Sequence, residues 1–340
     1  FGHIAGTASD FLMTRGSSST TTLAIQGLGK MNAARLFFLC ALASTFVSFI
    51  WICMPDSTFS FSKTSLLGFF VISIFRVVLC LILPIVYVAF YADTHEKEIV
   101  GTNPGIGVFL MCLLLGCPAG ILFVSTHNLS AYFFLSQKIT VASPAYNYVS
   151  QDSSKLALVL LVLMAYVIPI IAQELFFRGV FWEIFQAKTN TRAQNVLAAL
   201  FFSAYMLSPV DFLAFFLLGL VLGVVRRATN NVFCPILTQF GMLLTYFLSK
   251  EMLPYLDLTS VSSLIDLDTT VLYASLSALL ISLLSFFPVF SQIQRCGEKP
   301  TSLSLPHEKA PSLTKLAVFS WPLALGLLLF AAQWVLLLDL

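Results

Sequence analysis

Four ionisable side chains of this sequence fall inside long apolar stretches, where any chemistry would proceed without much water. They are Arg76, Glu174, Arg178 and Glu183. Ionisable groups in such surroundings are costly, which makes them candidates for a functional site. Glu174 and Arg178 are four residues apart with the acid first, the favourable order for an ion pair on one helix face. This pair could support general-base chemistry or could be a structural salt bridge, and the spacing leaves both open.

The composition indicates the kind of element that must position these residues. The 340 residues are 58% hydrophobic and only 10% charged, whereas a soluble domain has about 25% charged residues. A soluble core could not bury that much apolar surface without leaving large exposed patches. The net charge of +2 also gives no reason to expect nucleic-acid binding. The composition therefore predicts an integral membrane protein.

Apolar stretches recur along the chain at a length that suits membrane helices. A helix needs about 20 residues to cross the ~30 Å hydrocarbon core of a bilayer. The predicted spans cover residues 34–54, 66–91, 105–126, 155–187, 193–208, 210–225, 231–249, 269–292 and 316–338. The expected fold is an all-α, polytopic transmembrane bundle of about eight or nine spans, with Glu174 and Arg178 on the fourth.

The chain divides into four predicted regions. Residues 1–30 are polar and rich in Gly, Ser and Thr, and we interpret them as a disordered tail or a mis-assigned start before Met31. Residues 31–154 hold the first membrane helices, followed by a core at 155–250. A loop and two further membrane helices fill 251–340. Residues 127–154 are predicted to form an outer loop.

The distribution of Lys and Arg predicts the orientation in the membrane. With the N-terminus in the cytoplasm, twelve basic residues lie on the cytoplasmic side and four on the outer side. An excess of Lys and Arg marks cytoplasmic loops. The twelve are Arg15, Lys30, Arg35, Lys97, Lys188, Arg192, Arg226, Arg227, Arg295, Lys299, Lys309 and Lys315, and the four are Lys63, Lys138, Lys155 and Lys250.

The segment around Glu174 resembles a known family signature. Its sequence, QELFFRG at residues 173–179, resembles the EExxxRG motif of the CAAX-processing and bacteriocin-processing (CPBP, or Abi) intramembrane proteases, which include the type II CAAX prenyl endopeptidases. Further matches follow in the family's order up to about residue 250. They are Phe201 and Phe202 for the FxxxH motif, Gly219 and Gly223 for small residues of the next helix, and Asn230, Asn231 and Pro235 for the turn before the HxxxN helix.

The resemblance implies a helical core that hydrolyses peptides. In the family, adjacent glutamates and a His are thought to activate water, while a second His and an Asn are thought to stabilise the oxyanion. This sequence keeps Glu174, Arg178 and Gly179 but departs at the other positions. The first glutamate is Gln173, the first His is Met206 or, in the alternative alignment, Tyr205, the second His is Gln239, and the Asn is Leu243.

The histidines give a check that needs no alignment. The four in the chain, His3, His95, His127 and His307, are all predicted to lie in the tail or in loops, so none is expected inside the bundle as a base or metal ligand. The amide of Gln173 cannot accept a proton at neutral pH. No metal or cofactor is expected.

Three hypotheses follow. The first is an inactive CPBP homologue that binds a membrane peptide, a prenylated C-terminal tail or a partner subunit within the bilayer. The second is a working endopeptidase with Glu174 as base and Tyr205, Gln239 or Gln173 as hydrogen-bond donors. The third is a transporter or permease subunit with a polar path along Glu174, Arg178 and Arg76. Because relatives with this motif order are mostly bacterial, a bacterial cytoplasmic membrane is expected, with a eukaryotic endomembrane as the alternative.

Two further residues have competing interpretations. Arg76 could pair with Glu174 or Glu183, or could extend its head group towards the membrane surface. Asp211 lies in Ser208-Pro209-Val210-Asp211, which is typical of a helix start. Asp211 is therefore predicted to cap a helix rather than to act as a catalytic acid.

Overall fold

The computed structural model describes residues 33–54, 66–92, 100–137, 163–182, 191–252, 269–296 and 321–338. Each of the nine predicted apolar segments contains helix, and no strand occurs among these residues. The α-helices are α2 (Ala33–Cys53), α3 (Leu66–Val77), α4 (Leu83–Ala92), α6 (Ile106–Ser136), α8 (Ile168–Glu174), α10 (Thr191–Tyr205), α11 (Phe212–Thr229), α12 (Phe233–Met252), α13 (Thr269–Cys296) and α14 (Trp321–Leu338). Glu183, His3, His95, His307 and residues 1–30 lie outside the described ranges. The all-α prediction is confirmed.

Short π-helical turns interrupt the regular helices in the described ranges: η2 (Val78–Ile82), η4 (Leu163–Val167) and η5 (Leu175–Val180). Such turns are rare and occur frequently at functional sites. η2 joins α3 to α4, so that Leu66–Ala92 is one continuous helical rod, and η4 and η5 flank α8. The helix that carries the ionisable pair is therefore irregular on both sides of α8.

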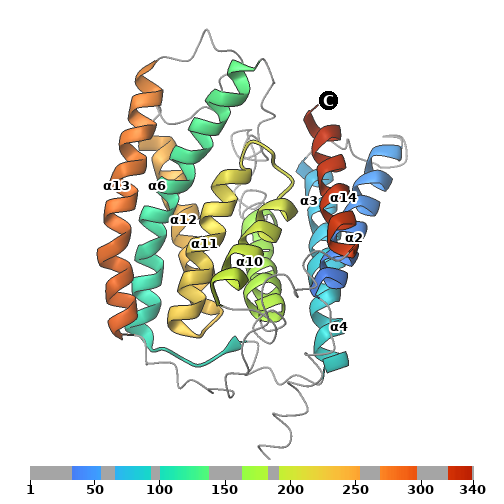
Figure 1. Ribbon diagram of the computed structural model, residues 1–340, viewed down its shortest axis with the longest axis horizontal. Coiled ribbons are helices and arrows are strands. Elements are labelled where there is room, and N and C mark those ends of the chain that lie inside the picture. The colour runs from blue at the N-terminus through green and yellow to red at the C-terminus, as the bar shows by residue number, and fades with distance from the viewer. Residues whose placement is uncertain are drawn as a thin grey trace, which may run out of the picture.

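The helices pack as two groups on either side of a central layer (Figure 1). α6, α11, α12 and α13 pack together on one side, and α2, α3, α4 and α14 on the other. α10 and the α8–η5 helix lie between them. Aromatic rings connect the α2 group to the central layer, since the Phe37 ring of α2 stacks on Phe201 of α10 at 4.2 Å. Phe37 also contacts Phe330 of α14 within its own group.

Glycines let the central helices approach closely. A Cβ at Gly116 of α6 would lie 2.4 Å from the Cα of Gly241 in α12, and one at Gly120 would lie 2.7 Å from Thr245. On the other face of the bundle, a Cβ at Gly219 or Gly223 of α11 would collide with α10. Small residues at helix interfaces are a common device in membranes, where close backbone packing replaces the hydrophobic driving force.

The turn between α11 and α12 forms as the motif comparison predicted. Asn230 adopts a left-handed conformation (φ 48°) that ends α11. The side-chain oxygen of Asn231 accepts a hydrogen bond at 2.7 Å from the Phe233 amide at the start of α12. Asn231 also donates to the Thr102 carbonyl at 2.7 Å. This turn is thereby tied to the segment that precedes α6.

Helix length and side-chain exposure indicate a membrane protein. Four helical stretches of the described residues are long and apolar enough to cross a bilayer by length and composition: Phe70–Val88, Ile106–Ser136, Phe212–Thr229 and Thr269–Ile293. The outer face of α13 is apolar and is not covered by other described residues, with Leu284 74% and Phe287 70% exposed. Such a face suits contact with lipid rather than water. The chain is an integral membrane protein.

Two positional predictions are corrected. α6 continues to Ser136, so the part of the predicted outer loop from His127 to Ser136 is helix. Arg226 is 1% exposed within α11, so it is not a cytoplasmic loop residue. Both errors have the same cause: apolarity locates a membrane segment well, but polar residues near its end are read as loop when they are in fact paired inside the protein.

The close contact of α6 with α12 gives a first prediction. Gly116→Leu should force these helices apart and destabilise the protein by at least about 1–3 kcal/mol, measured as a lower thermal unfolding temperature in detergent. Gly107→Leu is the matched control, because a Cβ added at Gly107 of the same helix would meet no heavy atom within 4 Å. Equal effects of the two substitutions would contradict the assigned packing.

Candidate functional site

The centre of the candidate site is the predicted ion pair. Arg178 Nη1 donates to Glu174 Oε1 at 2.9 Å, and both side chains are 0% exposed. Glu174 is the last residue of α8, and Arg178 lies in the π-helical turn η5. The i, i+4 pairing predicted from the sequence is confirmed. Burying two charges is costly unless their hydrogen bonds are satisfied, so the surroundings of the pair decide whether it is tolerated.

The neighbouring helices supply that support. Arg178 Nη2 donates to the Gly219 carbonyl of α11 at 3.1 Å, and the guanidinium lies 4.5 Å from the centre of the Phe202 ring. A Cβ at Gly219 would lie 2.9 Å from Ala199, so the lack of a side chain there keeps α11 close to α10. Glu174, Arg178, Phe202 and Gly219, which all lie at positions that match the family motifs, therefore form one structural unit.

A second buried arginine holds the backbone of this unit. Arg226 Nε donates to the Arg178 carbonyl at 2.9 Å, and Arg226 Nη1 contacts Asn230 Oδ1 at 3.4 Å. The Arg226 bond ties α11 to the backbone of the π-helical turn η5 at the residue that pairs with Glu174. The sequence comparison missed this residue, because Arg226 follows an apolar run and precedes Arg227, which is exposed.

Gln173 and Met206 face one another. Gln173 Nε2 contacts Met206 Sδ at 3.5 Å, and Gln173 is buried. Of the two residues considered for the position of the family's first His, Met206 is the one beside Gln173. An amide and a thioether can exchange a weak hydrogen bond, but neither accepts a proton at neutral pH.

Tyr205 belongs to a different contact. Its backbone carbonyl accepts a hydrogen bond from Arg76 Nη2 at 3.2 Å, and the guanidinium lies 5.5 Å from the ring centre. A basic side chain at the last carbonyls of a helix complements the helix dipole. Arg76 therefore caps α10, and no ion pair between Arg76 and Glu174 occurs among the described residues.

Gln239 and Leu243 lie on α12, which packs against α8. Gln239 is 3% exposed, and its Oε1 has no hydrogen-bond partner among the described residues. Leu243 packs with Tyr166 and Ile170 in an apolar cluster. Within the same part of the chain, Glu174 Oε2 and Arg178 Nε are also buried without partners. We call Gln173, Glu174, Arg178 and Gln239 the Glu174 layer. Unsatisfied buried polar atoms are rare in proteins, so the unpartnered atoms of this layer remain able to form hydrogen bonds.

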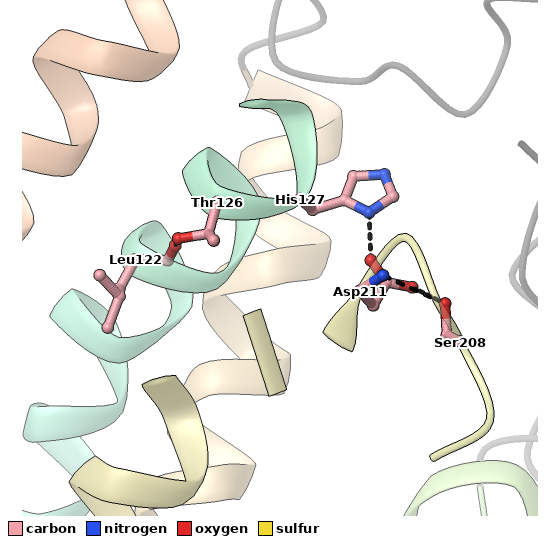
Figure 2. Close-up of polar contacts among 5 residues, drawn as sticks. All are labelled: Leu122, Thr126, His127, Ser208 and Asp211. Atoms are coloured by element: carbon pink, nitrogen blue, oxygen red, sulfur yellow. Dashed lines mark hydrogen bonds and ion pairs between the residues drawn. The ribbon is translucent and has the colours of Figure 1, made fainter. Parts of the chain in front are cut away.

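A histidine lies inside the bundle, contrary to the prediction. His127 is in α6 and is buried, and its Nδ1 donates to Asp211 Oδ1 (Figure 2). The other carboxylate oxygen of Asp211 accepts a hydrogen bond from Ser208 Oγ at 2.7 Å. The error arose because His127 lies beyond the most apolar part of α6, where the sequence pattern indicated a loop.

The role predicted for Asp211 is also corrected. Asp211 immediately precedes α11, but its side chain makes no capping hydrogen bond to the amides of this described helix. Its two carboxylate oxygens are instead occupied by His127 of α6 and by Ser208 of the preceding turn. The carboxylate therefore connects α6 to the α10–α11 turn.

The His127–Asp211 pair is separate from the Glu174 layer. Asp211 and Gly219, which receives Arg178, are eight residues apart along α11, or about 12 Å at 1.5 Å per residue. No group of three or more His, Cys, Asp or Glu side chains that could hold a metal ion occurs in the described part of the chain. The two buried ionic contacts therefore lie at different depths of the bundle.

The Glu174–Arg178 pair gives a second prediction. Arg178→Met should destabilise the protein by about 3–5 kcal/mol, because it leaves an unpaired buried carboxylate. The double variant Glu174→Leu/Arg178→Met should lose less stability than the sum of the two single variants, as residues in direct contact couple. Denaturation of all three variants in the same detergent measures this. Strictly additive losses would show that the pair contributes no coupling.

Comparison with known proteins agrees with this arrangement. Residues 155–245 match the family model described as type II CAAX prenyl endopeptidase Rce1-like. Comparison with curated proteins and with solved structures finds no match. The matched range includes α8, η5, α10, α11 and much of α12, which are the elements that contribute the contacts around Glu174. Over residues 155–245 the chain is therefore a match to the type II CAAX prenyl endopeptidase Rce1-like family, and the predicted resemblance is confirmed.

Proposed function

We propose that this protein is a homologue of the Rce1-like endopeptidases that has lost glutamate-dependent peptidase activity and binds its target instead. The observation that carries the proposal is the state of Glu174. Its carboxylate is 0% exposed and is held by Arg178 at 2.9 Å. A general base must reach the proton that it removes, directly or through one water. A carboxylate fully covered and already paired is poorly placed for that work.

The residues around Glu174 support the same conclusion. A working site needs a second proton acceptor and fixed donors for the developing oxyanion. The partner that faces Gln173 is Met206, a thioether. The histidine inside the bundle, His127, is committed to Asp211, about 12 Å along α11 from the Arg178 contact at Gly219. The residues that keep the helices together persist, and so does Glu174, whereas the other positions that would serve proton transfer or the oxyanion are replaced by Gln173, Met206, Gln239 and Leu243.

The proposed ligand is a membrane peptide, a prenylated C-terminal tail or a partner membrane subunit. Gln239 Oε1 and Glu174 Oε2 are buried acceptors without partners among the described residues. The rings of Phe177, Phe202 and Tyr205 pack together as an apolar wall. A peptide amide that donated to one of these acceptors would satisfy a group that is costly to leave unpaired. These features support a binding role.

The third prediction tests binding and cleavage separately. Purified protein in nanodiscs should bind a farnesylated CAAX peptide, yet release no more cleaved product than the Glu174→Gln variant does. Cleavage that depended on Glu174 would overturn the proposal in favour of a remodelled endopeptidase. Ion or solute flux through liposomes that was lost in Glu174→Gln would favour a transporter instead.

A gain-of-function variant sharpens this test. Gln173→Glu, Met206→His, Gln239→His and Leu243→Asn together restore the residue types of the family motifs. Positioned acid–base groups contribute about 10²–10⁴-fold to rates, and residues of one site act as a unit. The fourfold variant should therefore cleave the peptide at least about 10²-fold above background, whereas each single variant stays inactive. Equal activity of wild type and fourfold variant would contradict the proposed loss.

We further propose that the N-terminus is cytoplasmic, in a bacterial cytoplasmic membrane. With Arg226 buried, eleven basic residues (twelve less one) remain on the predicted cytoplasmic side against four on the outer side. The cytoplasmic side therefore still has the excess of Lys and Arg.

The fourth prediction tests this orientation with native cysteines. A membrane-impermeant maleimide should label Cys53, which is exposed at the end of α2, in intact cells. Cys117 is exposed on the side of α6 but faces lipid and should stay unlabelled. Labelling of Cys53 only after permeabilisation would invert the orientation.

A further inference from the structure

The connection between α10 and α11 is an unusual turn inside the bundle. It runs from Met206 to Asp211 and lies well below the ends of α6 and α13 (Figure 1). Leu207 has φ 55°, a left-handed conformation that non-glycine residues rarely adopt. Such a conformation persists only when its surroundings enforce it, and it is found frequently at switch regions.

The surroundings that hold the turn come from α6. His127 Nδ1 donates to Asp211 Oδ1, and Ser208 Oγ donates to Asp211 Oδ2 at 2.7 Å (Figure 2). The Asp211 amide returns a hydrogen bond to Ser208 Oγ at 3.3 Å. One carboxylate thus fixes both ends of the segment that follows Leu207. We call the contact of His127, Asp211 and Ser208 the latch.

The frame behind the latch is rigid. His127 lies nine residues before the end of α6, about 14 Å inside it. The adjacent Asn128 donates to Ser275 of α13 at 3.1 Å, and Ser282 of α13 donates to the Pro118 carbonyl at 2.6 Å. Because α12 also packs against the glycines of α6, two helices, α12 and α13, hold in place the helix that carries His127. The turn is the less constrained side of the contact.

In its present position the turn contacts the helix that carries Glu174. Met206, its first residue, lies beside Gln173 at 3.5 Å, and Gln173 directly precedes Glu174. Gln173 is 6% exposed. Because Met206 and Ser208 are separated only by the strained Leu207, a displacement of Ser208 and Asp211 acts on Met206 through this single residue. The latch is therefore placed to control the cover of this layer.

We propose that the Met206–Asp211 turn is a gate over Gln173 and Glu174, and that the His127–Asp211 contact holds it shut. When the contact is lost, Leu207 can leave its left-handed conformation, Met206 withdraws and Gln173 becomes accessible. The gate gives a route to a layer that is closed in the present structure. It does not depend on whether the layer hydrolyses peptides or only binds them.

The fifth prediction measures the opening directly. Gln173→Cys places a thiol beneath Met206, and peptide-resolved mass spectrometry follows its labelling by a small methanethiosulfonate in nanodiscs. His127→Asn or Asp211→Asn in this background should raise the labelling rate at least about tenfold, since a tenfold change corresponds to only about 1.4 kcal/mol. The double variant His127→Asn/Asp211→Asn should label at the rate of either single variant, since both break one contact. Ser208→Ala, which removes one bond and leaves the ion pair, should give a smaller increase.

A control thiol separates gate opening from general loosening. Ser44→Cys places it in the α2–α14 contact, where Ser44 is 0% exposed and approaches Gln333 at 3.3 Å. The labelling of this control thiol should not change in any latch variant. Unchanged labelling of the thiol at position 173, or an equal rise at both thiols, would overturn the gate. If His127→Asn and Asp211→Asn fail to fold, the milder Ser208→Ala still decides: no rise at position 173 counts against the proposal.

Discussion

The arrangement of the core depends on placing one ion pair, Glu174–Arg178, in an interior with no exposure to solvent. Two unsolvated charges are tolerated only with close geometry and further hydrogen bonds. The Gly219 carbonyl takes one bond of Arg178, and Arg226 holds its backbone. These demands explain why α11 must approach α10 closely and why glycines recur at their contact.

The same constraint shapes what the site can do. A carboxylate that neutralises a buried arginine already has a structural role, and that of Glu174 has no exposed surface through which a substrate could reach it. The neighbouring contact of Gln173 with Met206 is electrically neutral. The proposed loss of activity is compatible with a retained scaffold, because packing and catalysis depend on different atoms. One side-chain oxygen each of Glu174 and Gln239 has no partner in the described part of the chain, so each could still accept a hydrogen bond.

Other ionisable side chains of the bundle follow the same physical rule with other partners. Arg76 finds the carbonyl end of α10, and His127 finds Asp211 at a separation of 84 residues. Each contact joins a helix of an outer group to the α10–α11 connection. The turn between these helices is therefore held from two sides, by α3 at its start and by α6 at its end. A strained residue, Leu207, lies between the two points of attachment.

Local features of the amino-acid chain were enough to predict the membrane class, the apolar segments, the Glu174–Arg178 pair and the family resemblance over 155–245. They depend on runs of apolar residues, a four-residue spacing and short motifs. The folded arrangement showed that Met206, the residue of the preferred alignment, lies beside Gln173. It also assigned long-range partners to Arg76, which is partly buried, and to three buried side chains, Arg226, His127 and Asp211. Such contacts join residues far apart in the chain. In a membrane bundle, packing between helices sets how each helix is rotated and therefore which side chains meet. These helices are apolar on most sides, so the spacing of apolar residues does not indicate that rotation.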